Sequence, residues 1–342
     1  MSADSLYLDH AATTPLLPAA RDALLHGFAI WANPSSPHGP GRAARAALED
    51  ARARLKAALH WDGEVIFTSG ASEALALAIS RCVQPLAGVS VVEHEAVLRH
   101  AGDAARIVVD GLGLVDPAAC ALPGLVAVQQ VNNETGVMQP LEAVAAAVRG
   151  AGGLLLADAA QGAGKLALPD ADMIALSAHK FGGPIGVGAL LVRDWALLQP
   201  TGGQERGYRG GTENLPGVLA MVASLEAGAD WLDRAVQLRD RLDSAITAAG
   251  GISIAEGTAR VPSIAAYRMP GKSANAQLIR FDGMGIAVSA GSACSSGSLR
   301  TSHVLEAMGI AGANEVIRVS IGRETTEADI DRFIAAWQQV AG

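Results

Sequence analysis

The sequence predicts an α/β fold, in which a large, mostly parallel sheet carries helices on both faces and a smaller α+β domain is attached. Between about residues 20 and 195, short apolar runs typical of buried strands alternate with helical segments. That alternation is the pattern of a parallel sheet covered by helices. From about residue 252 onward, short strand-like runs are mixed with helices. The 342 residues are enough for a large core and for more than one domain.

The first half of the chain contains most of the expected sheet. Residues 44–59 are rich in alanine with charges of both signs, which predicts an amphipathic surface helix. The apolar run EVIFTSG ends at a glycine and predicts a buried strand followed by a turn. Helices are expected at residues 71–83 and 141–152, and further strands at residues 89–94, 125–134, 154–161, 172–180 and 186–192.

The second half begins with a loop rich in glycine and arginine, GGQERGYRGGTEN, at residues 202–214. A long helical stretch is expected at residues 216–250. The remaining strands are expected at residues 263–267, 286–291 and 316–322, where the sequence reads SIAAY, IAVSAG and VIRVSIG.

Composition excludes several classes of protein. Half of the residues are hydrophobic and 18% are charged, so the chain is expected to be ordered and globular. The net charge of −8 argues against a general binder of nucleic acid or of anionic membranes. No apolar run reaches about 18 residues, and the N-terminus lacks a basic and an apolar signal region, so we expect a cytoplasmic protein without a transmembrane helix. The three cysteines, Cys82, Cys120 and Cys294, are few and far apart, which favours free thiols in a reducing compartment.

Lys180 lies in the stretch SAHKFGGPIGVG, between two apolar runs. One interpretation is an ordinary lysine in a surface turn between two strands. The other is a lysine whose amine is kept neutral so that it can form a Schiff base. The local sequence leaves both open.

Two further motifs follow predicted strands. In TSGASEA, residues Ala71 and Ser72 open a helix, whose first backbone amides suit a phosphate or simply carry an ordinary cap. Asp158 stands at the end of LLLADAAQ with Gln161 three residues later. In open α/β sheets, ligands collect at the carboxyl ends of strands, so Asp158 is either a partner for a protonated ring nitrogen or an acid satisfied by loop amides.

His94 also follows a strand-like run, in VVEHEAV. The run is not a zinc HExxH motif, because Leu98 stands where the second histidine is needed. His94 is therefore a packed structural residue or a ligand contact. The nearby VQQVNNETG offers two asparagines for directional hydrogen bonds, or for a plain turn. GKSAN is not a phosphate-binding P-loop, because Ala266 stands where the motif needs glycine.

Cys294 is the candidate reactive thiol. It lies in VSAGSACSSGSLRTS, where small and polar residues surround it on both sides. Free cysteines are usually buried, whereas a reactive thiol needs access. The segment from about Ser289 to Arg300 is expected to be weakly ordered without a ligand, and Cys82 and Cys120 are expected to be bystanders. An inert loop cysteine is the alternative.

Taken together, these motifs resemble the cysteine desulfurases, which are pyridoxal-phosphate (PLP) enzymes of the class V aminotransferase family. The context of Cys294 is similar to that of the nitrogen-fixation-type group (group I). The resemblance covers nearly the whole chain and implies fold type I of the PLP-dependent transferases. The matching stretches are YLDHAATTP, NPSSPHGPG, FTSGASEALALAI, EHEAVL, VNNETGV, ADAAQGAGK, SAHKFGGPIGVGAL, GGQERGYRGGTEN, SAGSACSSGSL and IRVSIGRETT.

The resemblance also implies a role for each matching residue. Lys180 would hold PLP and move protons, His94 would stack on the ring, and Cys294 would take the substrate sulfur as a persulfide; these three are the implied catalytic residues. Further cofactor contacts are implied for Ala71, Ser72, Ser177, His179, Asp158 and Gln161, and for Thr212, which would reach the PLP phosphate of a neighbouring subunit. Substrate contacts are implied for Asn133, Arg318 and the nearby Asn33. No metal is implied.

The expected function is therefore the conversion of L-cysteine to L-alanine, with the sulfur passing to an acceptor protein. The alternatives are a selenocysteine lyase or another class V enzyme, and a sulfur-accepting scaffold that is not an enzyme. We expect a homodimer with a large PLP-binding domain at residues 15–245 and a small domain at residues 1–14 and 246–342. Ile185 replaces a lysine that many relatives carry, and the C-terminus is shorter than in relatives that dock an iron–sulfur scaffold. The acceptor is therefore left open among such a scaffold, another thiol protein and a thiolation enzyme.

Overall fold

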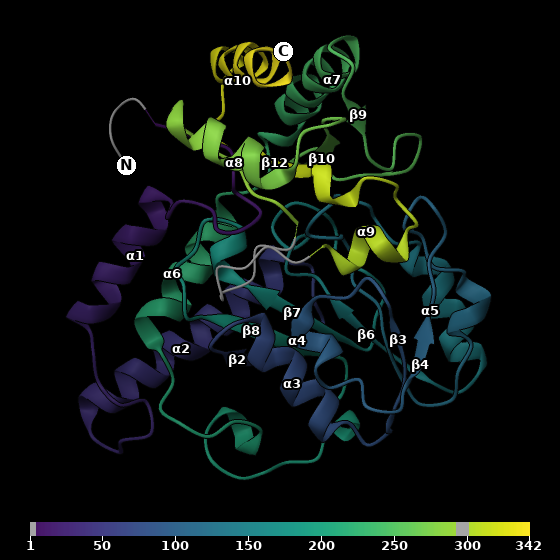
Figure 1. Ribbon diagram of the computed structural model, residues 1–342. Coiled ribbons are helices and arrows are strands. Elements are labelled where there is room, and N and C mark those ends of the chain that lie inside the picture. Colours follow the sequence, from purple (N-terminus) through teal and green to yellow (C-terminus); the bar gives the residue numbers. More distant parts are fainter. Residues whose placement is uncertain (1–4, 292–300) are drawn as a thin grey trace.

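The structure is a computed structural model that describes residues 5–291 and 301–342. It has a large α/β part and a smaller part of helices and short strands, which lies above it in Figure 1. Both the α/β class and the smaller α+β part were predicted from the sequence. Among the helices described, none is long and apolar enough to cross a membrane.

The large part is built on a seven-stranded sheet. Strand β8 is antiparallel to both of its neighbours, β2 and β7, and the pairs from β7 to β4 are all parallel. The prediction of a mostly parallel sheet is therefore confirmed. In spatial order the strands are β2 (Glu64–Thr68), β8 (Gly188–Val192), β7 (Met173–Ser177), β6 (Leu154–Asp158), β5 (Leu125–Ala127), β3 (Leu86–Ser90) and β4 (Ala105–Ile107).

Helices cover both faces of this sheet. Successive strand residues point to opposite faces, and in β6 Leu155 and Ala157 join one apolar cluster while Leu156 joins another. The first cluster includes residues of α2, α5 and α6, and the second includes residues of α3 and α4. Burial on both faces explains why these strands are almost wholly apolar. The helices are α1 (Pro18–Ala29), α2 (Gly39–Ala58), α3 (Ala71–Arg81), α4 (Glu95–Leu98), α5 (Leu141–Gly150) and α6 (Leu215–Glu226).

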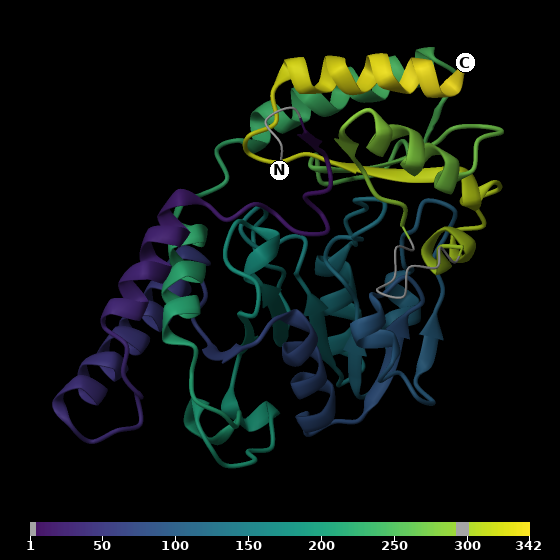
Figure 2. The same ribbon diagram turned by 60° about the vertical axis from the view of Figure 1, so that its left-hand side comes forward.

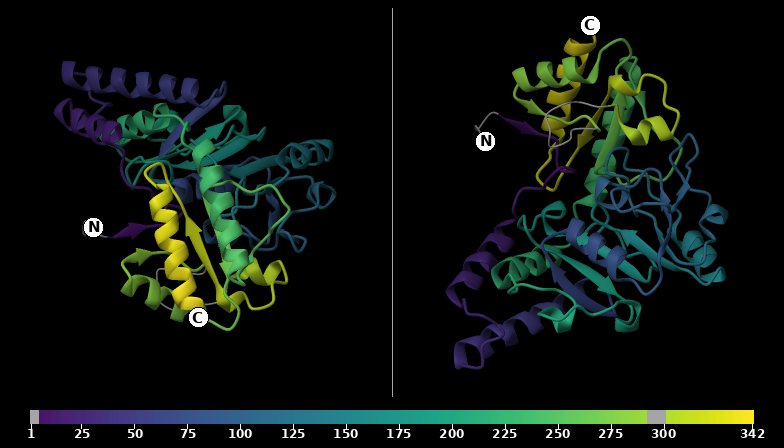
Figure 3. Two further views of the ribbon diagram at one scale, coloured as in Figure 1. Left: turned by 90° about the horizontal axis from the view of Figure 1, so that it is seen from above. Right: turned by 60° about the horizontal axis from the view of Figure 1, so that its bottom comes forward.

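The smaller part has its own core, which centres on the aromatic residues Tyr267, Phe281, Phe333 and Trp337. An antiparallel sheet with the order β12-β10-β9 lies beneath α7 and α10, which run side by side (Figure 2; Figure 3). Strand β1 of the N-terminus pairs with β11 in parallel. The elements are β1 (Leu6–Tyr7), α7 (Leu232–Ala248), β9 (Ile252–Ser253), β10 (Ile264–Arg268), α8 (Ala274–Gly283), β11 (Ile286–Ala287), α9 (His303–Ala307), β12 (Val316–Ser320) and α10 (Glu327–Ala341).

Several expectations about element boundaries were wrong. The strand expected at residues 125–134, for example, is β5, which ends at Ala127. The long helix expected at residues 216–250 is two helices, α6 and α7, separated at Gly228, whose φ of +71° is the left-handed conformation that glycine tolerates. The strand expected at residues 89–94 ends at Ser90, because the Ser90 carbonyl and hydroxyl accept the amides of Glu93 and Val92 in a turn. The proposed domain boundary at residue 245 falls within α7, whose buried face packs in the smaller core, and the division stays a prediction.

Candidate active site

The carboxyl ends of the sheet strands open into one large cavity of about 1020 Å³. Strands β6 and β7 run parallel, and both end at this edge, as ligand sites in open α/β sheets do. The structure brings most of the predicted site residues together here. Those that line the cavity are Ala71, Ser72, His94, Asn133, Asp158, Gln161, Ser177, His179, Lys180 and Arg318.

Lys180 follows β7 in a short 3₁₀ turn, Ala178–Lys180. Its Nζ donates hydrogen bonds to the carbonyl oxygens of Ala11 (2.6 Å) and Ala12 (2.9 Å). Burial, reinforced by the nearby charge of Arg318, lowers the pKa of Lys180 to about 8. The amine therefore loses its proton more easily than an exposed lysine, as the Schiff-base interpretation requires.

The start of α3 forms a cradle for an anion. The N-cap residue Gly70 has a φ of +150° and, among the described residues, the first amides of α3 receive no side-chain cap. A Cβ at Gly70 would lie 3.6 Å from the Ser177 hydroxyl oxygen, so glycine leaves space between this hydroxyl and the helix start. Backbone amides at the positive end of a helix, together with Ser177, suit a phosphate group.

His179 lies two residues after Ser177, in the 3₁₀ turn that follows β7, and lines the same cavity. Its Nδ1 lies 3.2 Å from the hydroxyl oxygen of Thr13. Burial, followed by the charge of Lys180, lowers the pKa of His179 to about 4. His179 is therefore neutral near pH 7 and contributes a hydrogen bond rather than a charge.

Asp158 is the buried acid of the cavity. Its Oδ1 accepts a hydrogen bond of 2.9 Å from the amide of Ala160. Burial raises the pKa of Asp158, and this bond together with nearby His94 and Lys180 opposes the shift. A carboxylate that is poorly solvated gains from a cationic partner, and a protonated ring nitrogen is such a partner.

Gln161 and His94 flank Asp158. The Nε2 of Gln161 donates to the carbonyl of Ala11 at 2.8 Å, and its buried Oε1 has no partner within the described ranges. His94 caps the short helix α4, where its Nδ1 accepts the amide of Ala96 at 3.1 Å, and burial lowers its pKa. The imidazole is therefore held as a neutral ring on the wall of the cavity, which suits stacking on a flat ligand.

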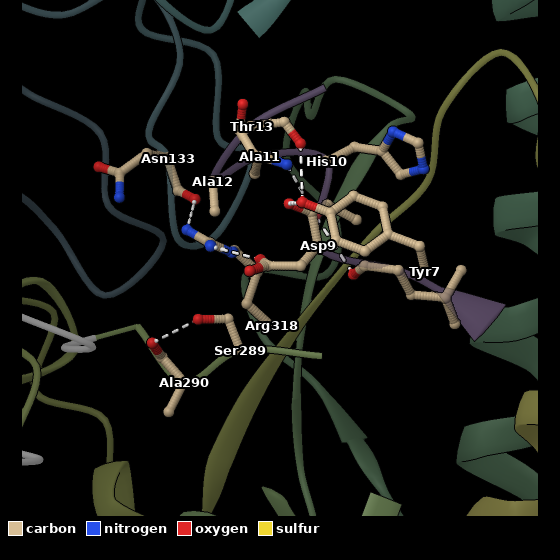
Figure 4. A network of polar contacts seen from close by, with 12 residues as sticks. Tyr7, Asp9, His10, Ala11, Ala12, Thr13, Asn133, Ser289, Ala290 and Arg318 are labelled. Atoms are coloured by element: carbon tan, nitrogen blue, oxygen red, sulfur yellow. Dashed lines mark hydrogen bonds and ion pairs between the residues drawn. The ribbon is translucent and has the colours of Figure 1, made fainter. Parts of the chain in front are cut away.

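Arg318 enters the cavity from β12 in the smaller part. Figure 4 shows its guanidinium between Asn133 and Asp9. Its Nη1 donates to the backbone carbonyl of Asn133 at 3.0 Å, and its Nη2 lies 2.8 Å from Oδ1 of Asp9. Arginine binds carboxylates with two parallel hydrogen bonds, so this position suits a substrate carboxylate.

Sequence reasoning gave no role to three residues of the N-terminal segment. Asp9 pairs with Arg318, and the carbonyls of Ala11 and Ala12 hold Lys180. The only signal in the sequence was the motif YLDHAATTP, which contains all three.

Three predicted site residues are not placed in the cavity of this chain. Asn33 and Thr212 are exposed and do not line it. Thr212 was expected to reach the site of a neighbouring subunit, and both roles stay predictions. Cys294, with most of the segment expected to be weakly ordered, lies outside the described residues, which stop at Gly291 and resume at Thr301.

Residues 6–333 match the model of the aminotransferase class-V family. The chain belongs to this family. A cysteine desulfurase of Cereibacter sphaeroides is 39% identical to it, over 97% of this chain and 94% of the relative. A cysteine desulfurase of Gluconacetobacter diazotrophicus is 36% identical, over 97% of this chain and 92% of the relative. The structure of a NifS-like protein from Rickettsia africae has a TM-score of 0.91 and 28% identity, and the match covers 98% of this chain and 99% of that one.

These findings confirm fold type I of the PLP-dependent transferases and PLP as the cofactor. The cavity of this class-V chain also fits PLP on its own geometry. The start of α3 with Ser177 suits the phosphate, and the buried carboxylate of Asp158 suits the ring nitrogen. Within residues 5–291 and 301–342, no cluster of histidine, cysteine and acidic side chains has the composition of a metal site.

Proposed function

We propose that the chain is a cysteine desulfurase, which converts L-cysteine to L-alanine and passes the sulfur, as a persulfide on Cys294, to an acceptor protein. The observation that carries this proposal is that Lys180, Asp158 and Arg318 line one cavity in a chain whose curated relatives are cysteine desulfurases.

PLP, when bound, supplies an electron sink that weakens the bonds at the α-carbon of the substrate. The residues of the chain have distinct tasks around it. The amides of Ala71 and Ser72 hold the phosphate, and Asp158 keeps the ring nitrogen protonated. Arg318 binds the substrate carboxylate. Lys180, with its lowered pKa of about 8, takes the α-proton and returns it later.

The thiolate of Cys294 would then attack the substrate sulfur. A sulfur–sulfur bond forms while the carbon–sulfur bond breaks, so that Cys294 carries the persulfide and alanine leaves after protonation. Gly291 and Thr301, the described residues on either side of the segment with Cys294, both line the cavity. This placement supports Cys294 as the sulfur acceptor.

The other two thiols are poorly suited to this task. Cys120 is fully buried, and burial raises its pKa to about 11. Cys82 caps the C-terminal end of α3. The helix is about 16 Å long, and its opposite, N-terminal end faces the cavity. Burial also raises the pKa of Cys82, and a thiol with a raised pKa is a poor nucleophile.

The test uses Cys294→Ser, with Cys82→Ser as the matched control. The Cys294→Ser enzyme should still bind PLP and still change colour on adding L-cysteine, but it should form no persulfide and release no sulfide. Mass spectrometry of the wild type should show one extra sulfur on the peptide that contains Cys294. Full activity in Cys294→Ser, or the extra sulfur only on Cys82 or Cys120, would contradict the proposal. A selenocysteine lyase or an aminotransferase would share the PLP residues, and sulfide release from L-cysteine separates the desulfurase from them.

The proposal includes a homodimer. Large apolar side chains on and just after α1 are exposed, with 60% of Leu25, 60% of Phe28 and 73% of Trp31 accessible. A cluster of exposed apolar side chains is typical of a protein–protein interface. Thr212 and Asn33, which are exposed outside the cavity of their own chain, would contribute to the neighbouring site. The cytoplasmic location and the identity of the acceptor stay predictions.

Light scattering tests the dimer. The wild type should have the mass of two chains, and Trp31→Asp should shift the protein toward the monomer and weaken PLP binding. The matched control is Ile279→Asp, since Ile279 is equally exposed (74%) on α8 of the smaller part. A fully active monomer would contradict this part of the proposal.

A further inference from the structure

Asp9 places a carboxylate near two basic residues of the site, Arg318 and Lys180. Its Oδ1 lies 2.8 Å from Nη2 of Arg318. Its charge also acts on Lys180, where it opposes the lowering of that pKa. Asp9 lines the same cavity as both residues. The acid is therefore part of the wall that a substrate bound at Arg318 would touch.

The backbone holds Asp9 firmly in this place. The carbonyl oxygen of Asp9 accepts hydrogen bonds from the Tyr7 hydroxyl (3.1 Å) and the Ala12 amide (3.0 Å). Asp9 also forms a parallel bridge with Ser320, two residues after Arg318 on the same strand. With Oδ1 bound to Arg318, Oδ2 makes no hydrogen bond to any described residue. One oxygen of Asp9 thus orients the arginine, and the second is available to a ligand in the cavity.

A carboxylate in this position is unfavourable for a ligand that carries only a negative charge. It repels a second carboxylate bound at the same guanidinium and reduces the attraction of Arg318 for it. A zwitterion has both charges, and its ammonium group would gain from the acid that penalises its carboxylate. The Asp9–Arg318 pair therefore matches the two charges of an α-amino acid better than it matches an acid or an amine alone.

We propose that Asp9 binds the α-ammonium group of the substrate while Arg318 binds its carboxylate, so that the cavity selects free α-amino acids. This inference rests on the proposed desulfurase for the identity of its substrate. Asp9 is then a specificity-determining residue that also positions Arg318. It places the substrate nitrogen beside the turn of residues 9–12, whose carbonyls at Ala11 and Ala12 hold the Lys180 amine that this nitrogen must replace.

The test measures non-covalent binding to the PLP-loaded enzyme after borohydride reduction, which fixes the cofactor on Lys180 and prevents exchange with an added amine. Calorimetry compares L-alanine with L-lactate, which has a hydroxyl group in place of the ammonium. The wild type should prefer L-alanine by about 10- to 100-fold, as expected for a charge-assisted hydrogen bond.

Asp9→Asn keeps an oxygen for Arg318 but loses the charge, so the preference should fall close to one while L-lactate binds at least as well as before. The matched control is Asp331→Asn, which alters another arginine–aspartate pair, with Arg241, away from the cavity. This control should keep the preference of the wild type.

Three outcomes would overturn the inference. In the wild type, equal binding of L-alanine and L-lactate would do so without any variant, whether or not Asp9→Asn folds. An unchanged preference in Asp9→Asn would exclude the ammonium contact. Loss of both ligands in Asp9→Asn would show that Asp9 only orients Arg318. Sulfide release by the untreated wild type is measured separately, so a failure of the desulfurase proposal is distinguished from a failure of this one.

Discussion

The cavity has two walls that are built in different ways. The cofactor wall, made of Ala71, Ser72, Asp158, Ser177 and Lys180, comes from residues that follow or face the strand ends of one sheet. The clamp wall, made of Asp9, Asn133 and Arg318, joins residues up to 309 positions apart. The first wall is a consequence of local chain direction in a parallel sheet. The second brings the N-terminal segment and β12 of the smaller part against Asn133 of the larger part.

The two walls also treat charge differently. On the cofactor wall, Asp158 forms no ion pair with a described residue, and Lys180 is bound to neutral carbonyls. Burial shifts the pKa of each toward its neutral form. On the clamp wall, Arg318 is already paired with Asp9. Titratable groups without an ion-pair partner are suited to proton and electron movements, while a preformed ion pair is suited to binding. We therefore expect substitutions in the cofactor wall to lower turnover and substitutions in the clamp wall to lower substrate affinity.

Lys180→Ala should have the largest effect. It removes the only group on the cofactor wall that can both attach to the cofactor and carry the α-proton, so turnover should fall below detection. PLP should still bind through its phosphate, because the start of α3 is unchanged. Sulfide release and the absorbance of bound PLP are the measurements. Desulfurase activity close to that of the wild type would remove Lys180 from the mechanism.

Asp158→Ala should come next. Without the carboxylate the ring nitrogen loses its proton, and the carbanion loses its electron sink. The loss of one preorganised electrostatic group costs about 2.7–4 kcal/mol, or about 10²–10³ in turnover. Turnover is measured at saturating PLP, so that weaker cofactor binding does not contribute. An unchanged rate under these conditions would show that Asp158 is merely the partner of the Ala160 amide.

The contrast between the walls also decides how much could be predicted from the sequence. Asp158 and Lys180 were placed correctly at the sheet edge because each follows an apolar run whose direction in a parallel sheet is predictable. Asp9 was missed because nothing in a local pattern indicates a contact with Arg318 on a strand of the smaller part. The break at Gly228 was also missed, because helical periodicity on both sides concealed a glycine that can end a helix. Asn33 and Thr212 do not line the cavity of their own chain, and the proposed contribution to a neighbouring chain's site is one that no pattern within one chain specifies.

Arg318→Lys tests the clamp wall, and its effect should be smaller and of a different kind. Lysine keeps the charge but loses the planar fork that holds Asp9, Asn133 and a carboxylate together. The KM for L-cysteine should rise by about tenfold, equivalent to about 1.4 kcal/mol, while kcat changes much less. Steady-state kinetics separate the two constants. A fall in kcat with KM unchanged would assign Arg318 to the chemical step and would remove the distinction between the walls.

Glu93→Gln should have the smallest effect on activity. It tests the protonation state of a buried acid near Asp158. Glu93 is fully buried, and its Oε1 accepts the amide of Gln129 at 2.8 Å. Burial raises the pKa of Glu93 well above its usual value, and the charge of Asp158 adds to the shift. Burial therefore favours the protonated form of this side chain in the folded protein. Glutamine replaces that form with a neutral group of the same shape that still accepts the same hydrogen bond. Turnover should change little.

Stability should instead reveal the protonation of Glu93. Because its folded pKa is raised, the folded wild type holds a proton that the unfolded chain releases above about pH 4.3. The unfolding free energy of the wild type should therefore fall, relative to that of Glu93→Gln, as the pH rises from there toward the raised pKa, by at most about 1.4 kcal/mol per pH unit. Urea unfolding at a series of pH values measures the difference. If the difference in unfolding free energy between the wild type and Glu93→Gln does not vary with pH, Glu93 is ionised in the folded protein. A second negative charge would then lie near Asp158.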